Sequence, residues 1–285
     1  MDKSIVITGV SSGIGNQMAK SFAKKGYFVF GSVRKQKDAE SLVAEFPDNY
    51  TPLIFDVTDY QAIDQSVAQV KEKLNGQPLT GLINNSGIAL SGPLLQTSIE
   101  DFKRQFEVNL FGLIKVTQSF LPLLGASFDF TETPGRIINI SSAAGQIGFP
   151  FLSPYCGSKH AVEGVSESLR RELSHLGIKV ILVGPTAIKT SIWEKEGAEL
   201  PDEIRDGLFG KQATNFIKLF SRSGRNGLLA HQFADKVVTI FEKRNPNVRY
   251  TISAHKFSDW IIPRYFPTRM IDKSIAKVLN WKKKK

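Results

Sequence analysis

Tyr155 and Lys159 form the pair of side chains whose types and spacing most directly suggest chemistry. Of the six tyrosines in the sequence, Tyr155 alone has a lysine four residues later. Residues i and i+4 share one face of a helix, so the lysine ammonium would lie beside the phenol and stabilise its phenolate form. A phenol whose pKa falls from its ordinary value near ~10 exchanges a proton more readily at neutral pH. The pair therefore predicts a tyrosine that can act as a proton donor or acceptor near neutral pH.

The segment from Thr8 to Gly15 has the composition of a phosphate-binding loop. It reads Thr-Gly-Val-Ser-Ser-Gly-Ile-Gly and stands between a short apolar run and a helical pattern. Glycines allow a sharp turn and let an anion approach the helix N-terminus, where free N–H groups and the helix dipole favour negative charge. In a strand–helix unit near the N-terminus, such a loop predicts a bound dinucleotide.

Short β-rich runs alternate with longer helical patterns and supply the elements that position these groups. We expect strands over 5–8, 28–32, 52–56, 79–84, 136–141 and 179–183, and helices over 16–25, 60–74, 99–124 and 154–175. This alternation predicts an α/β fold in a single domain, residues 1–255: a doubly wound, Rossmann-type parallel sheet with helices on both faces. Beyond 183 the pattern is less regular. Residues 186–229 are mixed, 230–244 look helical and 249–253 strand-like.

The spacing of the glycine loop, Thr-Gly-x-x-x-Gly-x-Gly, resembles that of the short-chain dehydrogenase/reductase family. Four further motifs extend the resemblance over about residues 3–255: Asn84-Asn85-Ser86-Gly87, Asn109 in a Val-Asn-Leu-Phe-Gly segment, Ser142 thirteen residues before Tyr155, and Pro185-Thr186-Ala187-Ile188-Lys189-Thr190. Two positions depart from the family pattern, because Ser86 replaces an alanine and Thr186 a glycine. The general appearance is most similar to relatives that act on steroids and retinoids.

The resemblance implies a catalytic group of Asn109, Ser142, Tyr155 and Lys159. Tyr155 would exchange the proton with the substrate oxygen, while Lys159 would tune Tyr155 and hold the nicotinamide ribose. Ser142 would hydrogen-bond the substrate oxygen and stabilise the charge that develops there. Asn109 would complete a water-linked proton relay to Lys159. The nicotinamide cofactor would supply the hydride.

The resemblance also implies a set of cofactor-binding residues. They are Gly9, Ser11, Ser12, Gly13, Ile14, Gly15, Arg34, Asp56, Val57, Asn85, Ser86, Gly87, Tyr155, Lys159, Pro185, Ile188 and Thr190. Val33 stands where NAD-preferring relatives carry Asp, and the next residue, Arg34, is a cation suited to the 2′-phosphate of NADP. The sequence therefore favours NADP over NAD, with a solvated turn at Arg34 and Lys35 as the alternative.

The segment over 186–229 is expected to form a lid over the substrate. It is rich in apolar residues, among them Trp193, and Ile147 and Phe149 precede Tyr155 as a second apolar wall. With Ser142 and Tyr155 these residues form the predicted substrate site. An apolar pocket favours a lipophilic ketone or alcohol, such as a steroid, a retinoid or a long-chain keto compound. The alternative is a lid that packs on its own core.

The formal charge of +10 is concentrated at the C-terminus. Residues 256–285 hold nine cations against Asp259 and Asp272, which leaves +7 on these 30 residues and +3 on the first 255. A nucleic-acid-binding domain would carry its charge on the body of the fold, so we expect no nucleic acid partner. On a helical wheel of residues 269–281, Met270, Ile271, Ile275, Val278, Leu279 and Trp281 fall on one side. This basic amphipathic extension would dock on the body or on a second subunit, or lie in a membrane interface.

Several classes of protein and of site are disfavoured. Cys156 is the single cysteine, which excludes an intramolecular disulfide and favours a reducing compartment, the cytoplasm. It is expected to face the interior, and the four histidines show no metal-ligand spacing, so we predict no metal. No signal peptide or membrane-spanning run is recognised.

The resemblance implies a homo-oligomer, a dimer or tetramer. Two other functions remain: an NAD-dependent alcohol or hydroxysteroid dehydrogenase of the same fold, and a non-catalytic nucleotide-binding sensor or scaffold.

Overall fold

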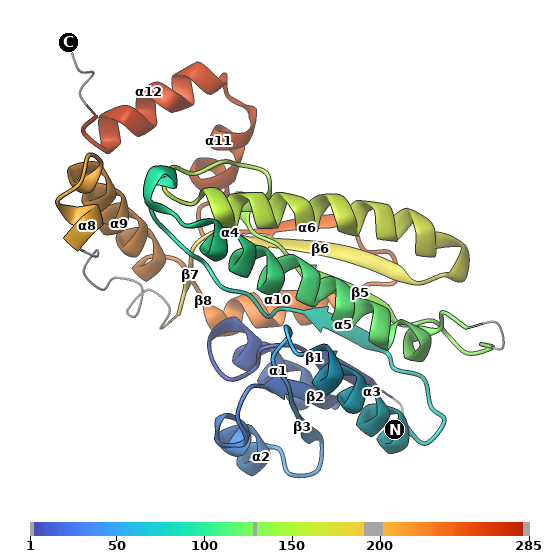
Figure 1. Cartoon of the computed structure of the whole chain (residues 1–285). Helices are drawn as coiled ribbons and strands as arrows, with labels where there is room; N and C mark the ends of the chain where they lie inside the picture. The colour runs from blue at the N-terminus through green and yellow to red at the C-terminus, as the bar shows by residue number, and fades with distance from the viewer. Residues whose placement is uncertain (1–2, 128–129, 191–201, 282–285) are drawn as a thin grey trace.

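A seven-stranded parallel sheet forms the centre of the protein (Figure 1), which a computed structural model describes over residues 3–127, 130–190 and 202–281. The strands are β1 (Ser4–Ile7), β2 (Phe28–Val33), β3 (Tyr50–Ile54), β4 (Gly81–Asn84), β5 (Arg136–Ile140), β6 (Lys179–Pro185) and β9 (Arg249–Ile252). Their order is β3-β2-β1-β4-β5-β6-β9, and all neighbours are parallel. The order reverses between β1 and β4, so the predicted doubly wound α/β fold is confirmed.

Helices cover both faces of this sheet. On one face lie α1 (Gly13–Lys24) and α10 (Ala230–Glu242), and on the other lie α3 (Tyr60–Leu74), α5 (Gly112–Phe120) and α6 (Ser153–Glu172). The residues of β1 divide between the two cores. Ile5 and Ile7 join the core that contains Phe22 of α1, whereas Val6 joins the core that contains Phe120 of α5. Burial on both faces explains why the strands carry so few charges.

The helix predicted over 99–124 is interrupted. The structure has α4 (Ile99–Phe106), a π-helical turn over Glu107–Phe111, then α5 and a 3₁₀ turn over Leu121–Leu124. The π-helical turn contains Asn109, whose buried amide pairs with both polar groups of the Ile88 backbone: Oδ1 accepts from the N–H at 2.8 Å, and Nδ2 donates to the carbonyl at 3.0 Å. Single π-helical turns are frequent at functional sites, and this one aims Asn109 at the end of β4.

The segment after β6 contains more helix than its sequence pattern predicts. It forms β7 (Ile188–Lys189), α8 (Asp202–Arg205), α9 (Gly210–Arg225) and β8 (Leu228–Leu229), and β7 pairs with β8. Glycines lie at the start and near the end of α9, and glycine is unfavourable in helices. The sequence pattern therefore does not predict a helix here, although the residues between the glycines are amphipathic. The short α2 (Glu40–Glu45) is a second helix that the pattern does not reveal.

The C-terminal extension is helical, and only part of the apolar side predicted for residues 269–281 is buried. After a π-helical turn over Phe257–Ile261 come α11 (Ile262–Tyr265) and α12 (Thr268–Val278). Ile275 and Leu279 pack inward, whereas Met270 and Val278 are exposed. Helix α12 docks through residues spaced by four, Ile275 and Leu279, and this contact buries only part of the apolar surface of the helix.

No helix among the described residues is long and apolar enough to cross a membrane. Within the same residues, no three His, Cys, Asp or Glu side chains gather as ligands for a metal ion.

Candidate active site

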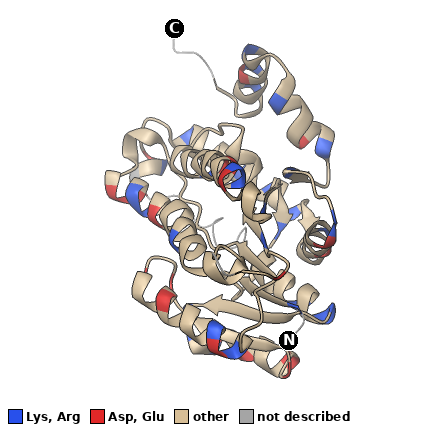
Figure 2. Ribbon diagram, turned by 90° about the vertical axis from the view of Figure 1, so that its right-hand side faces the viewer, with Lys and Arg blue, Asp and Glu red and all other residues tan. Residues whose placement is uncertain are grey.

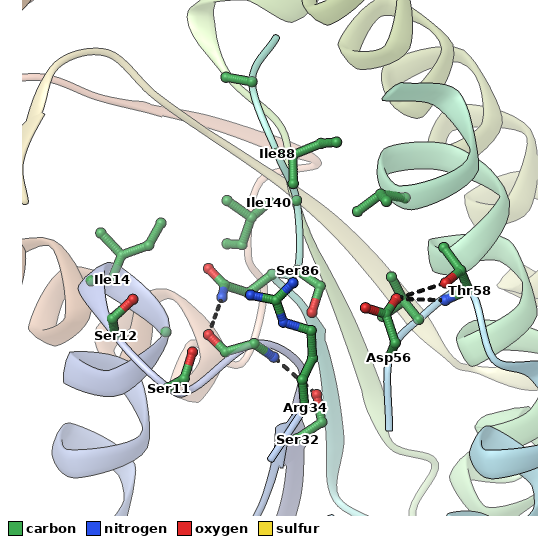
Figure 3. A pocket seen from close by; sticks show the side chains of 18 of the residues that line it. Ser11, Ser12, Ile14, Ser32, Arg34, Asp56, Thr58, Ser86, Ile88 and Ile140 are labelled. Carbon is green, nitrogen blue, oxygen red and sulfur yellow. Dashed lines mark hydrogen bonds between the residues drawn. The ribbon is translucent and has the colours of Figure 1, made fainter. Parts of the chain in front are cut away.

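A cavity of about 750 Å³ lies at the carboxyl ends of the sheet strands, where doubly wound folds bind their ligands. Nearly all the predicted cofactor-binding residues line it, namely Gly9, Ser11, Ser12, Gly13, Ile14, Gly15, Arg34, Asp56, Val57, Asn85, Ser86, Gly87, Tyr155, Lys159, Pro185 and Thr190. Ile188 is the exception, because its side chain is buried in the core beside α10. Loops after β1, β2, β3, β4, β5 and β6 thus meet around one space (Figure 3).

Close backbone approach explains the glycines of the loop after β1. A Cβ on Gly15 would lie 2.1 Å from the carbonyl oxygen of Gly9, and Gly9 has a φ of +72°, which other residues rarely adopt. Thr8 Oγ1 accepts hydrogen bonds from the N–H groups of Asn85 at 2.9 Å and Ser86 at 3.0 Å. The Asn-Asn-Ser-Gly motif therefore holds the glycine loop against the end of β4.

The start of α1 fits a phosphate. Ser12, the residue before the helix, makes no capping hydrogen bond through its side chain, and the first turn holds no acidic residue. The N–H groups of that turn and the helix dipole therefore favour an anion in the cavity. Figure 3 shows Arg34 extending into the space between this loop and Asp56. Asp56 Oδ1 accepts from Thr58 N at 3.0 Å and Thr58 Oγ1 at 2.8 Å, which fixes its carboxylate. These groups fit a dinucleotide.

Two further cations of α4, Lys103 and Arg104, line the same cavity. No motif marks them, and their helix reads as an ordinary amphipathic one, so sequence reasoning missed them. With Arg34 and Lys159 they outnumber the acidic lining residues Asp56 and Glu107, and this excess of positive charge suits a cofactor with several phosphates.

Lys159 lies beside Tyr155 at the far end of this cavity. Its ammonium donates to the Ile140 carbonyl at 2.8 Å and stands 6.0 Å from the centre of the Tyr155 ring. Burial lowers the pKa of Lys159 from 10.5 to about 8, and the negative charge of Glu163 opposes that fall. The structure thus places a buried cation next to the predicted proton donor.

Asn109 and Ser142 lie next to the cavity rather than in its lining. A Cβ at the lining residue Gly87 would be 3.1 Å from Asn109 Oδ1 and 3.8 Å from Lys159 Nζ, so both groups approach one point of the backbone. Ser142 follows a residue that lines the cavity, and its Oγ accepts the N–H of Ala144 at 3.1 Å. The structure therefore brings Asn109, Tyr155 and Lys159 together, and it places Ser142 directly after the lining residue Ser141.

Glu163 is a nearly buried carboxylate that sequence reasoning missed, one turn after Lys159. Ser141 Oγ donates to it at 2.6 Å, and Arg249 donates twice, at 2.8 and 3.0 Å. The Arg249 guanidinium in turn lies 4.6 Å from the centre of the Trp260 ring. This network ties the end of β5 to β9 and to the C-terminal extension. The i, i+4 spacing was a usable signal, but Arg249 is 86 residues away and no local pattern predicts that pairing.

A comparison with protein families agrees with this architecture. The family model described as short chain dehydrogenase matches residues 3–201. The chain belongs to this family. As a short-chain dehydrogenase it is an oxidoreductase, so the resemblance and the fold expected from its motifs are confirmed.

Individual relatives extend the similarity along the chain. The "NADPH-dependent 3-dehydrocapnine reductase" of Ornithobacterium rhinotracheale is 38% identical over 275 residues, which cover 96% of each chain. Retinol dehydrogenase 16 of Mus musculus is 30% identical over 285 residues, 95% of this chain and 87% of its own. The solved structure "ElxO with NADP Bound" has a TM-score of 0.73 and 27% identity, and covers 90% of this short-chain dehydrogenase and 100% of ElxO.

An apolar cluster lies on the other side of Tyr155 in this short-chain dehydrogenase. It consists of Ala144, Phe149, Phe151, Leu152, Tyr155, Cys156, Phe216, Ile217, Phe220, Ile275 and Leu279. Phe149, a predicted substrate residue, belongs to it, and Ile147 is half-buried nearby in sequence. Trp193, the other predicted apolar contact, lies outside the described residues. The cluster joins the loop after Ser142, α9 and α12.

Cys156 is buried in the apolar cluster, as expected. Burial raises the pKa of its thiol, so Cys156 is not an activated nucleophile.

Thr186 stands where the family pattern has glycine. Its φ is not positive, so the loop after β6 does not require glycine at this position.

Proposed function

We propose that this short-chain dehydrogenase is an NADPH-dependent enzyme that interconverts a ketone or aldehyde and an alcohol on a lipophilic substrate. The observation that carries the proposal is one cavity lined at one end by the α1 N-terminus and Arg34, and at the other by Tyr155 and Lys159. When bound, NADPH would supply the hydride for reduction and NADP⁺ would take it up in the reverse direction. The NADPH-dependent relative and the NADP-bound ElxO support this cofactor.

The residues near Tyr155 then divide the work. The Tyr155 hydroxyl donates a proton to the carbonyl oxygen and recovers it in the reverse direction. Lys159 stabilises the phenolate with its charge and holds the nicotinamide ribose. Ser142 donates a hydrogen bond to the substrate oxygen, where negative charge develops. Asn109, held by the Ile88 backbone, orients the relay that returns a proton through Lys159.

A lipophilic substrate is supported by the apolar cluster, in which Phe149 packs near Tyr155. The names of two relatives give further support for a lipophilic substrate, since one is called a 3-dehydrocapnine reductase and the other a retinol dehydrogenase. We propose that Ile147, Phe149 and Trp193 contact the apolar part of the substrate, while Ser142 and Tyr155 bind its oxygen.

A substrate panel tests this function. The panel holds 3-dehydrocapnine, retinal, a steroid ketone and a short water-soluble ketone, each with NADPH and with NADH, and cofactor oxidation is followed by absorbance. We expect turnover of a lipophilic ketone or aldehyde, faster with NADPH. No turnover of any compound in the panel, with NADPH binding confirmed by fluorescence, would contradict the proposed enzyme activity and favour a nucleotide sensor. A preference for NADH would favour the NAD-dependent dehydrogenase.

We also propose that the protein is a cytoplasmic homo-oligomer of two or four chains. Support comes from large apolar side chains left exposed on α4 and the π-helical turn, Ile99 and Phe111. Sedimentation velocity at micromolar concentration tests the assembly. A dimer or tetramer is expected, and a monomer would contradict the proposal.

A further inference from the structure

Helix α12 touches the body of the protein with one side only. Ile275 and Leu279 enter the apolar cluster, and Asn215 of α9 donates to the Leu279 carbonyl at 3.1 Å. After the helix, the Trp281 ring packs edge-on against Phe151, with ring centres 6.2 Å apart. The inner side of the extension is therefore part of the wall on the substrate side.

The outer side of the extension leaves large apolar side chains exposed. Tyr265 is 71% exposed, Phe266 44%, Met270 54% and Val278 60%. The first three flank the corner where α11 meets α12, at the end of the molecule that also carries α8 and α9 (Figure 1). We name the four residues the outer apolar patch. Single exposed apolar residues are ordinary, but a group within fourteen residues marks a binding surface.

Cations surround the outer apolar patch. Arg264, Arg269, Lys273 and Lys277 are all exposed, and Figure 2 shows α12 at one end of the molecule with mainly cationic charged positions. The extension holds two acidic residues. The Asp259 carboxylate accepts hydrogen bonds from the hydroxyls of Ser253 and Ser258, and Asp272 is exposed. The sequence then adds four consecutive lysines at its end. The surface is both apolar and strongly positive.

This combination selects one kind of partner. A second copy of the chain, related by a twofold axis, would bring the same cations face to face, which is unfavourable. A nucleic acid would satisfy the charge and could stack on Phe266, but it offers no apolar phase for the exposed aliphatic side chains of Met270 and Val278. An anionic lipid surface accepts both, because aromatic and apolar side chains enter the interface while lysine and arginine meet the headgroups.

We propose that the corner of α11 and α12 binds the surface of an anionic membrane through the outer apolar patch and its flanking cations. The inner side of α12 walls the substrate side, so the bound protein holds its apolar cluster next to the lipid phase. This last step rests on the proposed function, because only a lipophilic substrate gains from that position. The binding itself does not depend on it.

Vesicle cosedimentation of the full chain tests the proposal. With phosphatidylcholine vesicles containing phosphatidylglycerol at low salt we expect binding, which weakens in high salt and with phosphatidylcholine alone. The variant Tyr265→Ser/Phe266→Ser/Met270→Ser should bind at least about tenfold more weakly. Its control is Val248→Ser, an exposed apolar residue on the body, which should bind like wild type.

A charge series completes the test. Arg269→Gln/Lys273→Gln/Lys277→Gln should weaken binding about 100-fold, while Lys24→Gln/Lys25→Gln/Lys71→Gln, which removes as many exposed cations from the body, should change it little. Equal losses in both triple variants would overturn the proposal, as would wild-type protein that stays in the supernatant. So would patch variants that change only the oligomeric state in sedimentation velocity.

Turnover of the full ketone and aldehyde panel with NADPH, measured without vesicles, separates the two proposals. Turnover without vesicle binding contradicts the membrane surface alone. Vesicle binding without any turnover contradicts the proposed function alone.

Discussion

The cofactor side of the cavity is built largely from backbone, whereas the substrate side is built from apolar side chains of distant segments. On the cofactor side, the close approach of Gly15 to Gly9 and the hydrogen bonds from Thr8 to Asn85 and Ser86 define the shape. On the substrate side, the apolar cluster joins the loop after β5, α9 and α12, which are far apart in sequence.

This difference separates two kinds of specificity. Backbone geometry at a glycine loop tolerates few residue types, so it serves one cofactor shape. An apolar cluster keeps its packing through many volume-conserving changes and can therefore be adapted to different substrates. Substitutions on the substrate side should accordingly leave the affinity for NADPH unchanged, and substitutions on the cofactor side should leave the affinity for the substrate unchanged. Tyr155 and Lys159 lie where the two sides meet.

Tyr155→Phe, at the junction, is expected to have the largest effect. The substitution removes the proton donor but keeps the ring, so turnover should fall by about 10²–10⁴-fold with little change in NADPH affinity. Steady-state rates and fluorescence titration measure the two quantities. Turnover within tenfold of wild type would mean that another group donates the proton.

Glu163→Gln tests the network that links the two sides. Glu163 and Arg249 are only 11% and 16% exposed, so the variant leaves a nearly buried guanidinium without its anion and should lower the free energy of unfolding by about 3 kcal/mol. Urea denaturation measures this loss. The control is Glu167→Gln on the same helix, whose pair with Arg171 is exposed and should cost less than about 0.5 kcal/mol. Equal losses of unfolding free energy in the two variants would show that the Glu163 network stabilises the protein no more than an exposed ion pair does.

Arg34→Asp acts on the cofactor side. Losing charge-assisted hydrogen bonds worth about 1.5–3 kcal/mol should raise the NADPH dissociation constant about 10–100-fold and leave that of NADH nearly unchanged. Lys35→Asp is the matched control, because Lys35 is exposed and is not in the described lining of the cavity. If both variants lose the same affinity, or the cofactor preference is unchanged, the 2′-phosphate is bound elsewhere.

Lys159 gives the junction a pH dependence. Its pKa is about 8 in the folded protein and near 10.5 when exposed, so between these values the unfolded chain binds more protons. The group therefore makes stability rise with pH in this window, by about 1 kcal/mol per pH unit. The stability advantage of Lys159→Met over wild type should shrink between pH 8 and 10, and with the exposed control Lys71→Met no such trend should occur. A constant difference would contradict a depressed pKa.

Leu279→Ala acts on the substrate side and is expected to have the smallest effect. Loss of a buried side chain loosens α12 against the apolar cluster, which should raise KM for a lipophilic ketone roughly threefold to tenfold. NADPH affinity should not change. Val278→Ala, one residue earlier and exposed, is the control. A change in NADPH affinity instead would show that the two sides are not independent.

The same division explains what could be predicted from the sequence. The glycine loop and the Tyr155–Lys159 spacing are local patterns, so the fold and the residues lining the cofactor cavity follow from them. Arg249 pairs with Glu163 across 86 residues, and Lys103 belongs to an ordinary amphipathic helix, so neither has a local signal. Which part of the apolar side of α12 is buried depends on the surface beneath the helix, which no helical wheel contains.

The central claim is that this protein transfers hydride from NADPH to a lipophilic carbonyl compound. The most direct measurement uses NADPH carrying deuterium at the transferring carbon of the nicotinamide, with mass spectrometry of the alcohol formed. The account predicts one deuterium on the former carbonyl carbon of a lipophilic product. With NADPH bound but no deuterium in any product across the panel of ketones and aldehydes, the account would be contradicted.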